Sequence, residues 1–99
     1  MIDGNYDIIM KTPVGPKSGE LSIVTENDFA SGTLNILGSI NVFTKGQIKG
    51  NRCSFSGEIK TAMEKVAYVA ECVFDNGQLT ALAKTAKGDM PITGIKQTA

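Results

Sequence analysis

A short motif, Lys-Thr followed by residues typical of turns, occurs three times in the chain, at residues 11–15, 60–64 and 84–88. Each copy closes one run of alternating polar and apolar residues and opens the next. Alternation with a period of two is typical of strands with one buried face, and turn residues between two such runs indicate a hairpin. This recurrence predicts a single domain, residues 1–99, with internal hairpin repeats.

The alternating runs predict about eight short strands, around residues 6–11, 19–24, 30–36, 40–44, 53–60, 66–74, 79–84 and 90–94. Residues 13–18 are expected to interrupt the chain, and Lys45-Gly46 to end the fourth run. Small residues recur on the inward phase, as a tightly curved sheet requires. Since closure also removes exposed strand edges, the sequence predicts an all-β fold: a small antiparallel up-and-down β-barrel of about eight strands.

The central hairpin carries a predicted register. If Lys60 and Lys65 close the turn, the residue numbers of every pair along the hairpin have the same sum. Cys53 then lies opposite Cys72. The inner face of the hairpin is then entirely apolar, whereas a slip by one residue would oppose inward residues to outward ones. We therefore expect two reduced thiols that face each other, with Cα atoms about 4.5 to 5.5 Å apart.

Composition excludes several kinds of chemistry. The chain has no histidine, which removes the commonest general base and the commonest zinc ligand, and no motif for a metal or a nucleotide is present. Ten basic and ten acidic residues are scattered singly, so nothing indicates nucleic acid or a membrane as partner. We expect no cofactor and no metal. With no secretory signal at the N-terminus, we expect a cytoplasmic protein.

One interpretation is a calycin-like barrel that encloses a small apolar ligand. Its lining would consist of the inward residues Tyr6, Met10, Phe55, Tyr68, Phe74 and Ile92, with Arg52 at one end as a clamp for a carboxylate or phosphate. An eight-stranded barrel is only just wide enough for its own side chains, so the interior would spare little beyond a slot at one end.

The favoured interpretation is a non-catalytic interaction or assembly module that binds itself, as a homo-oligomer, or a partner protein. It depends on apolar residues at positions expected to face water: Ile9, Val24, Phe43, Val69, Val73, Leu82 and Ile95. A cofactor-independent enzyme is the third possibility. Glu58 and Glu71 lie on outward phases of adjacent strands, but solvated surface carboxylates are the simpler interpretation, and no catalytic residue is assigned.

The chain also resembles a small β-barrel family of bacteria. The residues that carry the resemblance are the run at 6–15, Gly19-Glu20-Leu21, Ser31-Gly32, Glu58-Ile59-Lys60-Thr61 and the closing Met90-Pro91-Ile92-Thr93-Gly94. Members of the family have repeated Lys-Thr-Pro-Met-Gly turns; here Ala62 and Ala86 replace prolines, and Glu64 replaces a glycine. The family implies a barrel that occurs alone or appended to flavin-dependent oxidoreductases of the old yellow enzyme type, and thus a role accessory to such an enzyme.

Overall fold

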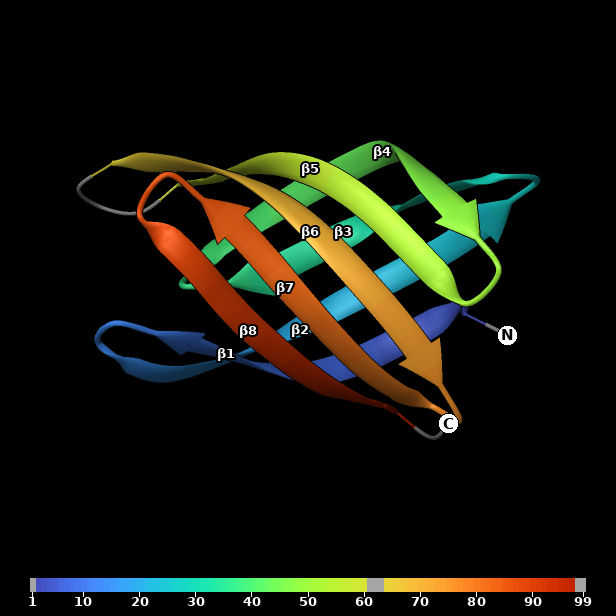
Figure 1. Cartoon of the computed structure of the whole chain (residues 1–99), viewed down its shortest axis with the longest axis horizontal. Helices are drawn as coiled ribbons and strands as arrows, with labels where there is room; N and C mark the ends of the chain where they lie inside the picture. Colours follow the sequence, from blue (N-terminus) through green and yellow to red (C-terminus); the bar gives the residue numbers. More distant parts are fainter. Residues whose placement is uncertain (1, 61–63, 98–99) are drawn as a thin grey trace.

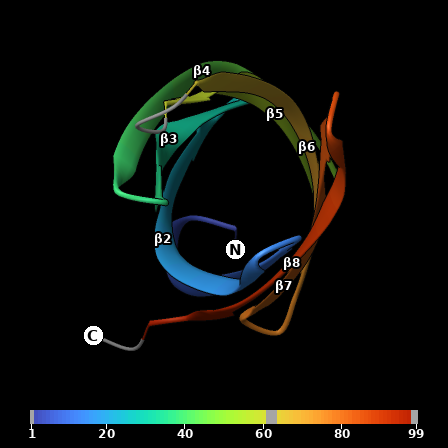
Figure 2. The same ribbon diagram turned by 90° about the vertical axis from the view of Figure 1, so that its left-hand side faces the viewer.

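The structure, a computed structural model, describes residues 2–60 and 64–97. It contains eight β-strands: β1 (Gly4–Thr12), β2 (Gly15–Glu26), β3 (Phe29–Ile36), β4 (Ser39–Lys49), β5 (Arg52–Lys60), β6 (Lys65–Asp75), β7 (Gln78–Thr85) and β8 (Gly88–Lys96). Each strand pairs antiparallel with its neighbours in sequence, and β8 pairs with β1 (Figure 1). The strands therefore form the closed up-and-down barrel that the sequence predicts, and Figure 2 shows the ring nearly end-on.

Two-residue turns connect most of the strands, because the closing pairs of the ladders leave two residues between them. Asn76 and Gly77 have φ angles of 50° and 76°, the left-handed conformation that a tight hairpin turn requires and that Asn and Gly adopt most readily. The Lys-Thr turns at 11–15 and 84–88 are closed alike: Thr12 Oγ1 donates to Gly15 O at 2.6 Å, and Thr85 Oγ1 donates to Gly88 O at 2.7 Å. The turn of the third copy includes residues 61–63, outside the described residues.

The expected interruption at residues 13–18 is too long. β1 ends at Thr12 and β2 already begins at Gly15, so the strand continues through Pro16. Proline lacks the N–H that a ladder uses. At Pro16 no N–H is needed for pairing with β3, because β3 ends at Ile36, opposite Gly19.

The central hairpin has the predicted register. Lys60 pairs with Lys65 and Cys53 pairs with Cys72. The Phe74 N–H donates to Asn51 O at 2.9 Å, so these two positions form a hydrogen-bonded pair, and every second pair along the ladder, including the cysteines, is of the same kind. The Cα atoms of such a pair are about 5.5 Å apart.

β4 departs from the expectation. It does not end at Lys45-Gly46 but runs on to Lys49, through a β-bulge where the pairing with β3 shifts between Ala30 and Gly32. Thr44 and Lys45 both face outward at the bulge, and Lys45 has a φ of 61°. Before the bulge, Phe43 faces the interior and is only 2% exposed. The expectation that Phe43 faces water was wrong, because β4 has apolar residues on both phases and its outward ones are Ile40 and Val42, each 68% exposed.

Candidate functional site

The barrel interior is filled by side chains. Met10, Phe55, Tyr68 and Ile92, predicted to line a ligand cavity, are buried in the core and surround a void of only about 10 Å³. Phe43 and Phe55 stack with ring centroids 3.9 Å apart. A void of that size holds at most one water molecule. The interior therefore has no room for an organic ligand.

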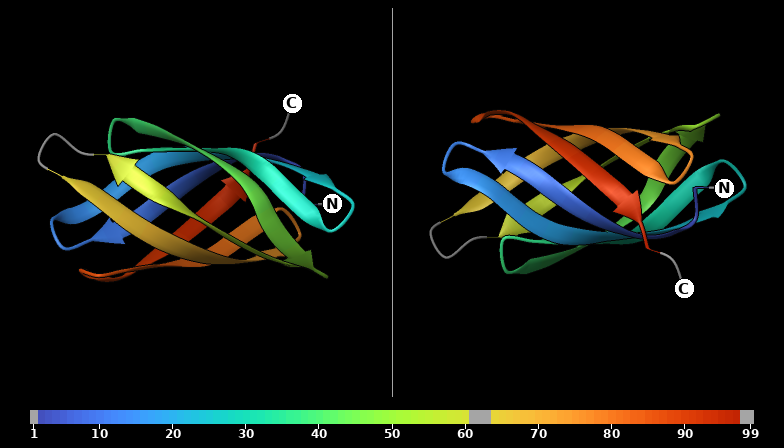
Figure 3. Two further views of the ribbon diagram at one scale, coloured as in Figure 1. Left: turned by 90° about the horizontal axis from the view of Figure 1, so that it is seen from above. Right: turned by 90° about the horizontal axis from the view of Figure 1, so that it is seen from below.

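A polar network crosses the β4–β5 boundary, where only three residue pairs form the ladder. Beyond them the two strands diverge (Figure 3, left), and the Asn41 side chain lies between them. Asn41 Nδ2 donates to Glu58 O at 2.7 Å, and Asn41 Oδ1 accepts a hydrogen bond from the Tyr68 hydroxyl. Burial, with a smaller contribution from Cys72, raises the pKa of Tyr68 to about 12, so the phenol stays protonated and donates. Asn41 was not among the predicted site residues. The local signal that could have indicated it is a polar residue between two apolar residues, Ile40 and Val42, on a predicted strand.

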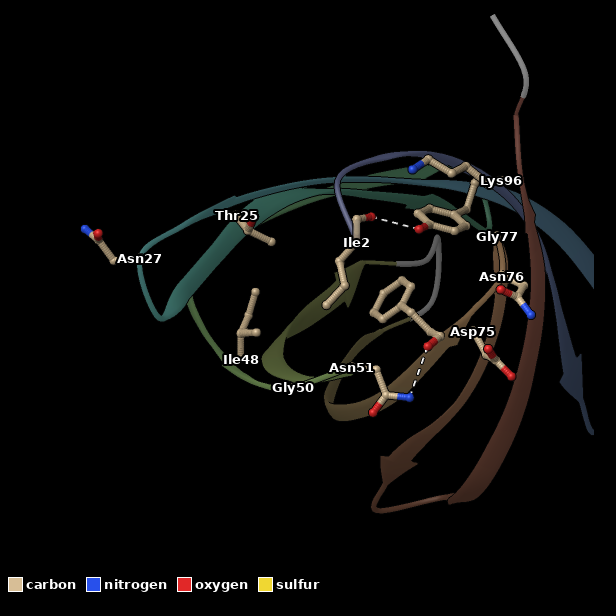
Figure 4. A pocket seen from close by; sticks show the side chains of 12 residues that line it. Ile2, Thr25, Asn27, Ile48, Gly50, Asn51, Asp75, Asn76, Gly77 and Lys96 are labelled. Atoms are coloured by element: carbon tan, nitrogen blue, oxygen red, sulfur yellow. Dashed lines mark hydrogen bonds between the residues drawn. The ribbon is translucent and has the colours of Figure 1, made fainter.

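A pocket of about 500 Å³ opens at one end of the barrel, which we call the mouth. This end carries the turns at 27–28, 50–51 and 76–77, and β1 begins and β8 ends there (Figure 1). Tyr6 and Phe74 form the floor, with ring centroids 5.3 Å apart, and Figure 4 shows Ile2 and Ile48 directed into the pocket. Of the predicted ligand-binding residues, only Tyr6 and Phe74 line this pocket.

The segment before β1 is held across the mouth by side-chain hydrogen bonds. The Tyr6 hydroxyl donates to Ile2 O at 2.7 Å (Figure 4), and the Thr25 N–H donates to Asp3 Oδ2 at 3.1 Å. The Thr25 hydroxyl also donates to Asp3 Oδ1. These bonds from Thr25 stabilise the charged carboxylate and lower the pKa of Asp3 below its usual value.

The second candidate site is on the outside, over β6, β7, β8 and β1. The register places Val73, Thr80, Thr93 and Ile9 side by side in one row across these four strands. Leu82 and Pro91 pair on one side of the row, and Ile95 lies on the other. We call these seven residues the uncharged face; β6, β7 and β8 turn it towards the viewer in Figure 1. Three of its large apolar members are exposed, Ile95 66%, Ile9 50% and Val73 37%, whereas Leu82 is half-buried.

Two hollows lie on the uncharged face and meet at Thr80. The β1–β8 hollow, of about 830 Å³, includes Ile9, Thr93 and Ile95 and extends to Asp7 and Glu20. Gly94, which has no side chain, is part of its lining. The β5–β6 hollow, of about 720 Å³, includes Val73, Leu82 and Pro91 and extends to Lys49 and Arg52. The face therefore combines projecting apolar side chains with hollows that are themselves partly lined by apolar side chains.

The predicted interface residues are only partly brought together. Ile9, Val73, Leu82 and Ile95 belong to the uncharged face. Val69 is exposed on β6 opposite Lys84, just beyond the Leu82 edge of the face. Val24 is exposed on β2, elsewhere on the barrel. Phe43 is in the core. Arg52 is exposed at the edge of the β5–β6 hollow and does not line the mouth.

The remaining titratable groups form no reactive cluster that the structure describes. Glu71 makes an exposed ion pair with Lys84 at 3.3 Å, and in residues 2–60 and 64–97 no group of three or more Cys, Asp or Glu could hold a metal ion. Burial raises the pKa of Cys53 to about 11 and of Cys72 to about 12, so both thiols stay protonated at neutral pH. The described part of the chain has no helix that could span a bilayer.

Comparisons with known proteins support the fold alone. No family model matches the chain, and neither does any curated protein. Among solved structures, a redesigned β-barrel is similar over 98% of this chain and 92% of its own length, with a TM-score of 0.65 and 14% sequence identity. The class that fold and surface define is therefore a small closed antiparallel β-barrel with a filled interior.

Proposed function

We propose that this barrel is a non-catalytic association module and that a second copy of the chain binds to the uncharged face. The observation that carries the proposal is the continuous row Val73, Thr80, Thr93 and Ile9, flanked by Ile95, Leu82 and Pro91, with no charged residue among the seven. A monomer tolerates scattered apolar residues, but a contiguous exposed patch is typical of an interface. The filled interior supports a role for the surface.

A second copy is the occupant that the chemistry favours. The face carries projecting side chains, such as Ile95, beside hollows that could receive them, so the same surface can serve both partners of a symmetric pair. The net charge of zero adds little long-range repulsion between copies. The resemblance to barrels appended to flavin-dependent oxidoreductases extends the proposal to such an enzyme as a further partner.

The test compares two double variants with the same change in charge. Val73→Lys/Ile95→Lys places two cations on the uncharged face and should give a monomer by light scattering. Ile40→Lys/Val42→Lys is the matched control, because both residues are more exposed and lie on β4, away from the face. It should associate like the wild type. If both variants associate equally, the uncharged face is not the interface.

A second candidate function is the binding of a small apolar molecule at the mouth. It is supported by the pocket of about 500 Å³, a size common for ligand sites, in which Tyr6, Phe74, Ile2 and Ile48 are apolar and the rest of the lining is mostly polar, including Asn51, Asp75 and Lys96. An environment-sensitive apolar dye should bind at the mouth of the wild type. The variant Ile48→Trp should no longer bind it, because the larger side chain fills the pocket. Ile40→Trp, on the outside of the same strand, should leave dye binding unchanged. Equal dye binding by both variants would exclude the mouth.

A further inference from the structure

The segment before β1 occupies part of the mouth with its own apolar side chain. Ile2 is partly buried against the core, and Figure 4 shows its side chain directed into the pocket. The two rings that form the floor, Tyr6 and Phe74, are buried although both line the pocket. A molecule that binds on this floor therefore competes with Ile2 for the same space.

The ladder between β1 and β2 stops just before this segment. It ends at Gly4, and its register would next join Ile2 to Thr25. Asn5 O accepts a hydrogen bond from the Gln97 N–H at 2.7 Å, so the odd-numbered residues of β1 direct their backbone groups to β8 and the even-numbered residues direct theirs to β2. A longer ladder would therefore bond the Thr25 N–H to Ile2 O.

Two side chains replace this bond in the structure. The Thr25 N–H donates to Asp3 Oδ2 at 3.1 Å, and Ile2 O accepts from the Tyr6 hydroxyl at 2.7 Å. The same donor and acceptor thus have two possible sets of partners, one in the observed conformation and one in an extended β1. Exchange between the two sets would move Ile2 to the β2 side of the mouth and free the Tyr6 hydroxyl.

Gly4 is the hinge between the two conformations. Its φ is 148°, which residues with a side chain rarely adopt. Residues in an antiparallel ladder have a φ of about −140°, which every residue type can adopt. Glycine at this position therefore makes the observed conformation accessible, and alanine would favour the extended β1.

We propose that Ile2 and Asp3 form a displaceable strap, which fills the mouth until a small molecule takes its place, and that this molecule carries a branched apolar group beside a carbonyl oxygen. Ile2 itself binds with these two features: its side chain enters the pocket and its carbonyl oxygen accepts from Tyr6. The inference rests on the mouth as a binding site, the second candidate function, and adds how the site is closed and which molecules open it.

Two variants that favour the extended β1 test the strap by fluorescence titration with the apolar dye N-phenylnaphthylamine. Gly4→Ala disfavours the φ that the strap requires, and Asp3→Ala removes both hydrogen bonds from Thr25. Because the open fraction sets the apparent affinity, we expect each variant to bind the dye about tenfold more tightly than the wild type.

Matched controls carry the same changes at the other end of the barrel. Gly88 begins β8 with a φ of 116°, and Asp89 follows it as an exposed carboxylate. Gly88→Ala imposes a comparable backbone strain, and Asp89→Ala removes the same charge. Both should bind the dye like the wild type.

Two small amides test the ligand class in the Gly4→Ala variant. N-acetylisoleucine methylamide has the side chain and the carbonyl group of Ile2, whereas N-acetylglycine methylamide has carbonyl groups alone. The isoleucine compound should displace the dye at a concentration about tenfold lower than the glycine compound, because only its side chain fills the apolar space. Adding Tyr6→Phe removes the hydroxyl donor and should weaken the isoleucine compound about fivefold relative to the dye.

The outcomes separate the strap from the site that it covers. If the wild type binds the dye, Ile48→Trp abolishes this binding and Gly4→Ala binds no more tightly than Gly88→Ala, the mouth is a site but the strap does not close it. If the strap variants bind more tightly but the two amides compete equally, the ligand class is wrong. Dye binding by none of these proteins contradicts the mouth as a binding site, and the strap with it.

Discussion

Gly94 offers a quantitative test of how tightly the barrel is packed. It is buried on β8, between Ile8 of β1 and Leu79 of β7. A Cβ at this position would lie 2.8 Å from Ile8 Cγ2, 3.1 Å from Asp7 O and 3.3 Å from Leu79 Cδ2. Ordinary contact begins at 3.4 Å, so the Ile8 methyl alone would have to move by about 0.6 Å, and the Asp7 contact is with backbone.

We therefore expect the destabilisation from overpacking to be larger than the stabilisation that comes from replacing a flexible glycine. Replacing Gly by Ala stabilises by about 0.4 to 1 kcal/mol through the unfolded chain, whereas forcing extra methyl groups into a packed core costs about 1 to 3 kcal/mol. Gly94→Ala should destabilise by about 1 kcal/mol and Gly94→Val by about 3 kcal/mol. At about 4 to 8 °C per kcal/mol for a domain of this size, the valine variant should melt about 12 to 24 °C below the wild type.

The assay is thermal unfolding followed by circular dichroism, with Ser56→Val as the control. Ser56 is exposed on β5, so valine there adds apolar volume outside the barrel. It should leave the melting temperature nearly unchanged. If Gly94→Val melts within about 2 °C of the control, Gly94 does not face a packed interior, and the assigned packing is wrong there.

Three further predictions concern single groups. Asn41→Leu should cost about 2 kcal/mol, because it leaves the buried Tyr68 hydroxyl without its acceptor, and adding Tyr68→Phe should recover part of this loss in urea titrations. Native Cys53 and Cys72 should resist a thiol reagent at pH 8, because their pKa values of about 11 and about 12 keep them protonated, and both should react once unfolded. The Asp3 carboxylate has a lowered pKa in the folded protein. Its stabilising contribution is therefore present above the unfolded value of 3.8 and lost as the pH falls through the folded one, so Asp3→Asn should flatten the stability profile in that range.

The sequence predicted the barrel because most strands have one apolar face and end at turn residues. The hairpin of β5 and β6 shows this best. Its inward residues pair only with inward residues in one register, and the structure has that register. Cys53 and Cys72 could be placed opposite each other for the same reason.

β4 could not be predicted in the same way. Ile40, Val42 and Phe43 put apolar side chains on both faces, and the bulge at Thr44 and Lys45 changes the phase within the strand. Asn41 faces inward against its polarity because Glu58 O and Tyr68 satisfy its amide. Those partners are on strands distant in sequence, so no local pattern indicates them.

The surface sites were also only partly predictable. A strand pattern tells which residues face outward, but whether outward residues form a patch depends on the register between strands. Ile9 and Val73 are far apart in the chain, yet one row connects them across β7 and β8. The mouth pocket could not be predicted either. One of its walls is held by the hydrogen bond from the Tyr6 hydroxyl to Ile2 O, and Ile2 lies outside the alternating run.

The mass of the wild-type protein in solution tests the central claim most directly. Light scattering coupled to gel filtration, from low to high micromolar concentration, should show a mass that rises to at least twice the 10.5 kDa of the chain. Val73→Lys/Ile95→Lys should remain at the mass of one chain throughout. A wild type that stays at 10.5 kDa at high micromolar concentration would contradict the proposal that the uncharged face binds a second copy.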